Sequence, residues 1–149
     1  MRPIHMLVTS LLVAAGTAAI AAPVLEGGRK FTTTLSGASE VNSAGVPNQG
    51  DPDGAGTARI IVNPGQARVC WEIETSNLDP VVGAHIHRAP AGQNGSIVVH
   101  LSAAQNAATS GCRDVTRALA DEIRKSPRSF YVNVHTTVYR AGAIRGQLG

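Results

Sequence analysis

Short segments in which apolar and polar residues alternate recur along the chain from Thr57 onward, and Gly- and Pro-containing turns separate them. An alternation with period two places one face of a β-strand against a core and the other face away from it. The 16 Gly and 8 Pro residues among 149 indicate many turns and therefore short strands. The pattern predicts a sheet protein in which long helices have little place.

We expect about seven strands and one short helix. Residues 114–125 form the helix, because Val115, Leu119 and Ile123 recur every four residues and Ser126-Pro127 follows them. Residues 36–56 hold many Gly and Pro and are expected to form a long irregular loop. The expected strands are residues 30–35, 57–63, 67–74, 81–87, 96–101, 130–138 and 143–148. This set predicts an all-β fold, either an antiparallel β-sandwich or a small barrel.

The composition is that of a chain with a core of its own. Hydrophobic residues make up 43 % of the sequence and charged residues 15 %, so the chain can bury an apolar interior. The formal net charge of +3 comes from scattered Lys and Arg, and only 3 % of the residues are aromatic. A chain without a basic run and with few aromatic rings is not expected to bind nucleic acid.

The N-terminal residues have the pattern of a secretory signal. Arg2 precedes an apolar stretch at residues 6–20, and Ala19-Ile20-Ala21 matches a small-x-small cleavage site. This stretch is shorter than the roughly 20 residues that span a bilayer. We predict a signal peptide at residues 1–21 and a single domain at residues 22–149, with no transmembrane segment after cleavage. The protein would then be secreted or periplasmic.

The two cysteines, Cys70 and Cys112, both lie in the predicted mature chain. An even pair of cysteines in an exported protein usually forms a disulfide. The alternative is a metal site with two thiolate ligands, but the spacing matches no zinc motif. A disulfide between Cys70 and Cys112 is therefore the favoured prediction.

Three histidines lie in segments with a clear alternation. His85 and His87 alternate with apolar residues in the strand expected at residues 81–87, and His135 alternates with Val132 and Val134. If the valines face the core, the three imidazoles lie on the face away from it. Residues i and i+2 of a strand are about 7 Å apart, so two such imidazoles can tilt toward one ion.

A set of three histidines suits copper or zinc with an open coordination position. His100 is a further candidate ligand. The alternative is that these imidazoles bind hydrogen-bond partners within the protein and hold no ion. The chain has no G-x-S-x-G, H-E-x-x-H or C-x-x-C motif and no P-loop, so we do not expect an enzyme.

Several ordered motifs resemble the chordin (CHRD) domain family. They are Gly83-Ala84-His85-Ile86-His87, Val98-Val99-His100-Leu101, Tyr131-Val132-Asn133-Val134-His135-Thr136 and Ile144-Arg145-Gly146-Gln147-Leu148. The opening Leu35-Ser36-Gly37-Ala38 with Glu40-Val41 also fits, so the likeness covers residues 30–149. The resemblance implies a secreted all-β domain without a settled activity. It includes the positions of His85, His87 and His135, whereas His100 occupies a variable position.

Two functions fit these observations. The first is a non-enzymatic binding or structural module in the cell envelope or outside the cell, which engages a protein, a polymer or a surface. The second is a copper- or zinc-binding metalloprotein with His85, His87 and His135 as ligands.

Overall fold

A computed structural model of the chain describes residues 28–101 and 110–149. The predicted signal peptide at residues 1–21 lies outside this part of the chain. The described residues form eight strands, one α-helix and two short 3₁₀ helices. In chain order these are β1 (Arg29–Ser36), η1 (Gly37–Ser39), β2 (Ala55–Asn63), β3 (Arg68–Ser76), β4 (Val81–Arg88), β5 (Ser96–His100), β6 (Ser110–Asp114), α1 (Arg117–Lys125), η2 (Pro127–Ser129), β7 (Phe130–Thr136) and β8 (Ile144–Gln147).

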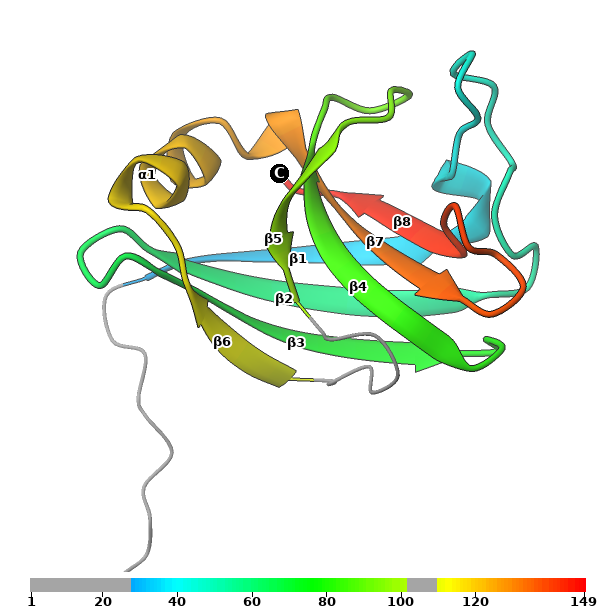
Figure 1. Cartoon of the computed structure of the whole chain (residues 1–149), viewed down its shortest axis with the longest axis horizontal. Helices are drawn as coiled ribbons and strands as arrows, with labels where there is room; N and C mark the ends of the chain where they lie inside the picture. The colour runs from blue at the N-terminus through cyan, green and yellow to red at the C-terminus, as the bar shows by residue number, and fades with distance from the viewer. Residues whose placement is uncertain (1–27, 102–109) are drawn as a thin grey trace, which may run out of the picture.

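The strands form one antiparallel sheet in the order β5-β4-β7-β8-β1-β2-β3-β6. Strands β1 and β8 meet at a single residue pair, Ser36 and Arg145, whereas β1 and β2 pair along their whole lengths. The sheet bends at this narrow junction, and the half that contains β4, β5, β7 and β8 crosses over the half that contains β1, β2 and β3 (Figure 1). This confirms the predicted all-β class, with an antiparallel sandwich or small barrel as its architecture.

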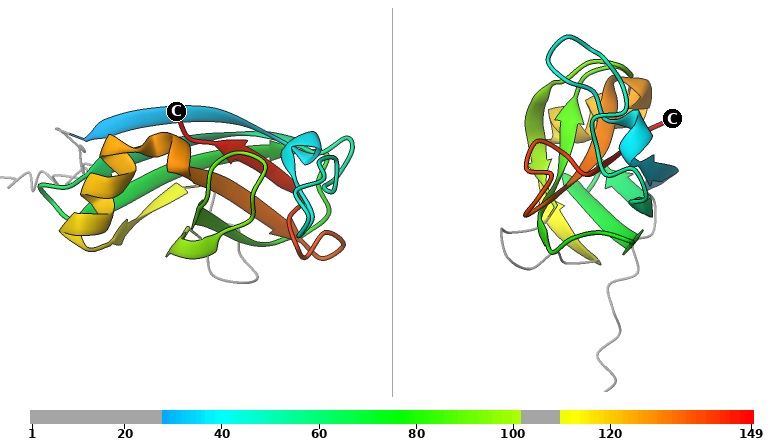
Figure 2. Two further views of the ribbon diagram at one scale, coloured as in Figure 1. Left: turned by 90° about the horizontal axis from the view of Figure 1, so that it is seen from above. Right: turned by 90° about the vertical axis from the view of Figure 1, so that its right-hand side faces the viewer.

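The apolar core lies between the two halves of the sheet. Val69, Trp71 and Ile73 of β3 are buried in it, as the alternation in this strand predicts. Opposite them, the core receives Ile86 from β4 and Val132 from β7. Helix α1 lies at one end of the sandwich and η1 lies at the other end (Figure 2). No helix among the described residues combines the length and the apolar character needed to cross a membrane.

The helix predicted at residues 114–125 is shorter than expected and begins at Arg117. The preceding residues form β6, an eighth strand that the sequence pattern does not indicate. The side chain of Thr116 caps the helix by accepting a hydrogen bond from the Leu119 N–H group at 3.1 Å. Strand β6 forms because it pairs with β3 and places Cys112 opposite Cys70, and the two cysteines form a disulfide.

The alternation in β4 is broken near its start. The pairing register with β7 shifts between Val81 and Gly83, and Val81 packs against the core although the alternation places it on the face of His85 and His87. Beyond this irregularity, Ala84 and Ile86 point into the core as predicted. His85 and His87 therefore occupy the opposite face.

Two loops cover part of that opposite face, which the sequence predicts to be exterior. The side chain of Asn94 donates hydrogen bonds to the Val41 and Asn42 carbonyls, and these contacts join residues 89–95 to the loop at residues 40–54. As a result, Tyr131 and Asn133 of β7 are each only 2 % exposed. Strand β7 is covered on both faces, by apolar side chains on one and by a polar network on the other.

Candidate metal site

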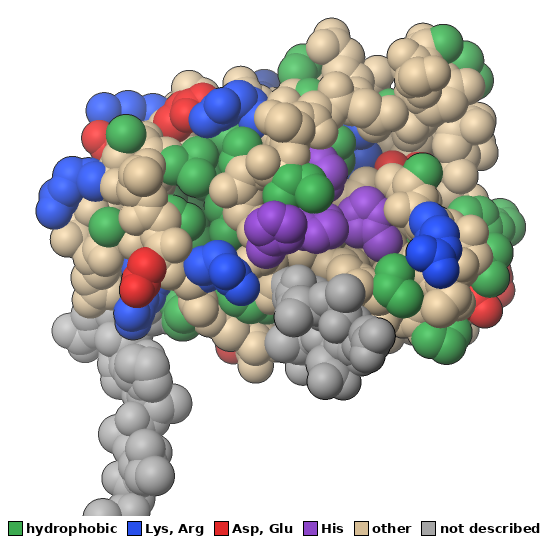
Figure 3. All heavy atoms as spheres, in the orientation of Figure 1, with side chains coloured by type: hydrophobic (Ala, Val, Ile, Leu, Met, Phe, Trp, Pro, Cys, Tyr) green, Lys and Arg blue, Asp and Glu red, His purple; other side chains and the backbone are tan. Residues whose placement is uncertain are grey.

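Three histidines meet on the loop-covered side of the sheet. His85 and His87 come from β4, and His135 comes from β7, which pairs with β4 in antiparallel fashion. Each histidine offers one ring nitrogen, and these three atoms lie within 4.8 Å of one another. The histidine side chains gather on a single surface of the molecule (Figure 3). The structure thus brings together the three residues that the alternation places on one face.

Backbone carbonyls orient two of the three rings. The Nδ1 atom of His87 lies 2.9 Å from the Gly95 carbonyl oxygen, and the Nδ1 atom of His135 lies 3.0 Å from the Arg140 carbonyl oxygen. Because a carbonyl only accepts hydrogen bonds, both Nδ1 atoms carry the proton. In the neutral rings the Nε2 atoms then present their lone pairs. Such outer hydrogen bonds are how proteins fix the tautomer and orientation of metal-binding histidines.

His85 is held by another histidine. Its Nδ1 atom lies 3.0 Å from the Nε2 atom of His135 and donates a hydrogen bond to that lone pair. In this tautomer the lone pair of His85 lies on Nε2, and an ion can bind at Nδ1 only after the proton has moved to Nε2.

The Nε2 atom of His87 is buried and has no hydrogen-bond partner among the described residues. His87 is only 8 % exposed. A buried polar atom without a partner costs free energy, and native structures contain few of them. Since Nδ1 is engaged by Gly95, Nε2 is the atom that His87 has available for an ion.

The site keeps its imidazoles neutral. Burial lowers the pKa of His85 to about 4, and repulsion from His135, His100 and His87 adds to the shift. Burial also lowers the pKa of His87 and that of His135. Only the neutral ring has a lone pair for a metal, so these shifts favour the ligating form at neutral pH.

His100 lies beside the three-histidine cluster. It is exposed on β5 directly opposite His85, and the two ring centroids are 4.9 Å apart with nearly perpendicular planes. Its nitrogens are not part of the set that converges within 4.8 Å. The structure therefore places this predicted further ligand next to the site and outside its inner set.

A polar network behind the site went unrecognised in the sequence. The Tyr131 ring stacks on His87 with centroids 4.8 Å apart, and the Arg145 guanidinium lies over the same Tyr131 ring. Arg145 is buried and donates hydrogen bonds to oxygen atoms of Asn94, Pro90 and Gln93.

Glu40 completes this network. Its carboxylate accepts a hydrogen bond from Asn133, and burial raises its pKa to about 7 against the opposing effects of Arg145 and Asn133. Glu40 and Arg145 both fall within the motifs that resemble the CHRD family, and those motifs are the signal that points to them.

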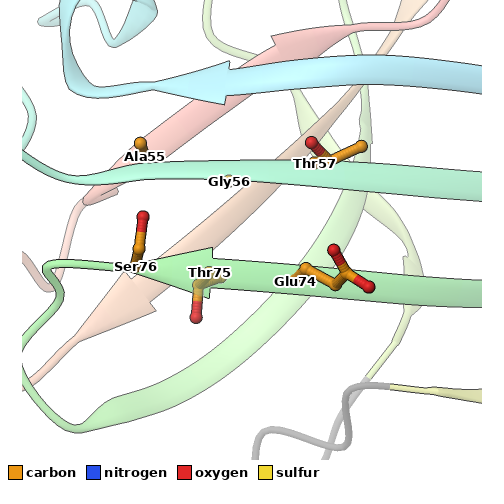
Figure 4. Close-up of a pocket in the computed structure, with 6 residues that line it drawn as sticks. All are labelled: Ala55, Gly56, Thr57, Glu74, Thr75 and Ser76. Atoms are coloured by element: carbon orange, nitrogen blue, oxygen red, sulfur yellow. The ribbon is translucent and has the colours of Figure 1, made fainter.

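Two of the surface hollows in the described part of the chain lie elsewhere, and no histidine of that part lines either of them. One has a volume of about 460 Å³ and is lined in part by Asp51, Asp53 and Asp79. The carboxylate of Asp51 accepts hydrogen bonds from the backbone N–H groups of Asp53 and Gly54, and these bonds stabilise the turn in which Asp51 lies. The other, of about 350 Å³, lies between the ends of β2 and β3 (Figure 4). Its lining residues are Ala55, Gly56, Thr57, Glu74, Thr75 and Ser76.

The fold and the site define a disulfide-linked all-β domain with a histidine cluster on one face of its sheet. The sequence model of the CHRD domain matches residues 31–148, and the chain belongs to the CHRD family. This confirms the resemblance that the motifs indicate. No curated protein and no solved structure matches the chain significantly.

Proposed function

We propose that this CHRD domain is an exported, non-enzymatic binding module and that its ligand is one copper or zinc ion. His85, His87 and His135 would hold the ion. The observation that carries the proposal is the Nε2 atom of His87, which is buried and has no partner among the described residues, in a histidine that offers one ring nitrogen within 4.8 Å of those of the other two. A bound ion would compensate this atom.

The chemistry of the donors supports copper or zinc. All three ligands are imidazoles, which suit these two metals, whereas calcium and magnesium require oxygen ligands. Three protein ligands also leave a coordination position for water or for a donor from another molecule. The carbonyl oxygens of Gly95 and Arg140 supply the outer hydrogen bonds that such a site needs.

Export is supported by two features. The disulfide between Cys70 and Cys112 is typical of oxidising compartments. The signal-like residues 1–21 point to the same destination, either the periplasm or the outside of the cell.

The decisive experiment is a titration of chelator-stripped protein with Cu(II) and with Zn(II). We expect one ion per chain. Replacing His85, His87 and His135 together with Gln should weaken binding by more than about 100-fold. The matched control is His100→Gln, which removes an exposed imidazole from the same surface and should leave the affinity nearly unchanged. A wild-type affinity no better than that of the triple variant would overturn the proposal.

A second function has support in the hydrogen bonds that the histidines make without any ion. Through these bonds the imidazoles would hold β4, β7 and two loops together in a structural module that binds a protein, a polymer or a surface. The variants His85→Gln and His135→Gln test this in metal-free buffer. A large fall in melting temperature supports the structural function, and an unchanged melting temperature contradicts it.

A further inference from the structure

The three inner histidines are anchored unequally. His87 is buried, and the Gly95 carbonyl holds it. His135 is half-buried, and the Arg140 carbonyl holds it. His85 is also half-buried, but its hydrogen bond within the described part of the chain goes to His135 and not to a backbone carbonyl. A ligand without a backbone anchor can reorient at the least cost, so His85 is the movable member of the set.

His100 is more exposed than the three inner histidines. It lies on β5, which is the end strand in the sheet order, and its side chain is exposed. The antiparallel register places it directly opposite His85, where the ring centroids are 4.9 Å apart. The four imidazoles therefore form a series from the exposed His100, through His85, to the two anchored rings.

We propose that His100 is the residue through which the site exchanges its ion with the surroundings. This inference rests on the metal site proposed above. The His100 lone pair displaces one water molecule from the hydrated ion, and His85 displaces a second. The nitrogen of His135 then displaces His100, and the nitrogen of His87 displaces a third water molecule. Each step replaces one donor by another, so no electron is transferred, and release follows the same steps in reverse.

A residue that acts only during exchange has a specific kinetic signature. It lowers the barrier between the free and the bound ion without changing the free energy of either state, so it speeds binding and release by the same factor. A permanent fourth ligand would instead stabilise the bound state and strengthen the affinity. Rates and affinity together distinguish the two roles.

The test uses chelator-stripped protein and Zn(II) alone, with stopped-flow measurement of uptake and of release to an excess of a chromophoric chelator. The variant His100→Gln should slow both rates by about tenfold or more and change the dissociation constant by less than about threefold. The control Ser96→Ala alters an exposed residue of the same strand and should leave both rates unchanged. The variant His100→Asp, which supplies a different donor, should restore much of the lost rate.

Two results would overturn the exchange role while leaving the metal site intact. In the first, His100→Gln binds and releases zinc at wild-type rates. In the second, it weakens the affinity as much as His87→Gln does, which would make His100 a permanent ligand. If the wild-type protein takes up no zinc in an equilibrium titration, the metal site itself is refuted and the exchange role is refuted with it.

Discussion

The guanidinium carbon of Arg145 lies 3.4 Å from the centre of the Tyr131 ring, and the ring of His87 stacks on the same phenol at 4.8 Å. Arg145 is only 2 % exposed. The Tyr131 ring thus lies between a buried cation and one histidine of the candidate metal site. The position of His87 therefore depends on residues outside its own strand.

Replacing Arg145 with Met should strongly destabilise the fold. The change removes the guanidinium donor of the Gln93 carbonyl and one of the donors of the Pro90 carbonyl, and it leaves the Glu40 side chain without its neighbouring cation. Removing one member of such a buried polar network costs about 3 kcal/mol or more. Equilibrium unfolding in urea measures the loss. The control Arg59→Met breaks an exposed ion pair with Glu72 and should cost less than about 1 kcal/mol. Equal losses in the two variants would contradict the role given to Arg145.

Gly95→Ala should weaken metal binding without touching a ligand. A Cβ atom at residue 95 would collide with the backbone carbonyl of Arg88 and lie 2.9 Å from the Ala89 Cβ, so the loop must shift. His87 would then lose the carbonyl that accepts its Nδ1 proton. Losses of this kind reduce metal affinity by about 10- to 100-fold. Isothermal titration with Zn(II) measures the effect, with Ser96→Ala as the neighbouring control. Unaltered zinc affinity in Gly95→Ala would show that the carbonyl does not orient the ring.

The alternation of apolar residues is sufficient to predict which face of each strand contacts the core. Val132 and Val134 enter the core, and this places His135 on the other face beside His85. The prediction succeeds because side-chain direction in a strand is fixed by the backbone. No distant residue has to be known for that inference.

The loops that cover the histidine-bearing face of the sheet could not be predicted in the same way. Glu40 lies in a Gly- and Pro-rich loop that makes hydrogen bonds with residues 52 to 93 positions away in the sequence, and no periodicity indicates such contacts. Strand β6 was missed for a related reason, since Ser110–Asp114 has little strand propensity and forms by pairing with β3 and through the disulfide to Cys70. Local patterns therefore predict most of the strands, whereas the path of the loops and the edge strand β6 depend on long-range contacts.

Removal of the disulfide should cost stability but leave the metal site intact. The bond between Cys70 and Cys112 closes a loop with a sequence separation of 42. The chain-entropy model assigns such a closure about 4 kcal/mol. The double variant Cys70→Ser and Cys112→Ser should lose up to that amount in urea unfolding. It should still bind zinc with wild-type affinity wherever it is folded, because β3 and β6 contribute no ligand. A loss of zinc binding by the folded double variant would contradict the separation of the two features.

The stability of the metal-free protein should fall on acidification from pH 6.5 toward pH 4. Burial lowers the pKa of His85 from 6.5 to about 4 and also lowers those of His87 and His135. As the pH falls below 6.5, the unfolded chain takes up protons that the folded site refuses, and the free energy of unfolding decreases. The stabilisation from the neutral histidines is thus complete above pH 6.5 and is lost as the pH approaches 4.

Protonation of Glu40 changes the free energy of unfolding in the opposite direction, and this provides a check on the histidine prediction. Its pKa is raised from 4.5 to about 7, so its contribution to stability is complete below pH 4.5 and is lost as the pH rises through 7. Between pH 4.5 and pH 7 the titration of this one carboxyl group changes the stability in the opposite direction to the titration of three histidines. The combined effect of the histidines should be the larger. Urea unfolding in chelator-containing buffer at a series of pH values measures the net slope. Glu40→Gln removes the opposing titration and should steepen the fall on acidification, whereas His85→Gln should flatten it. Parallel profiles for the wild type and both variants would mean that neither group is titrating in the way that its burial requires.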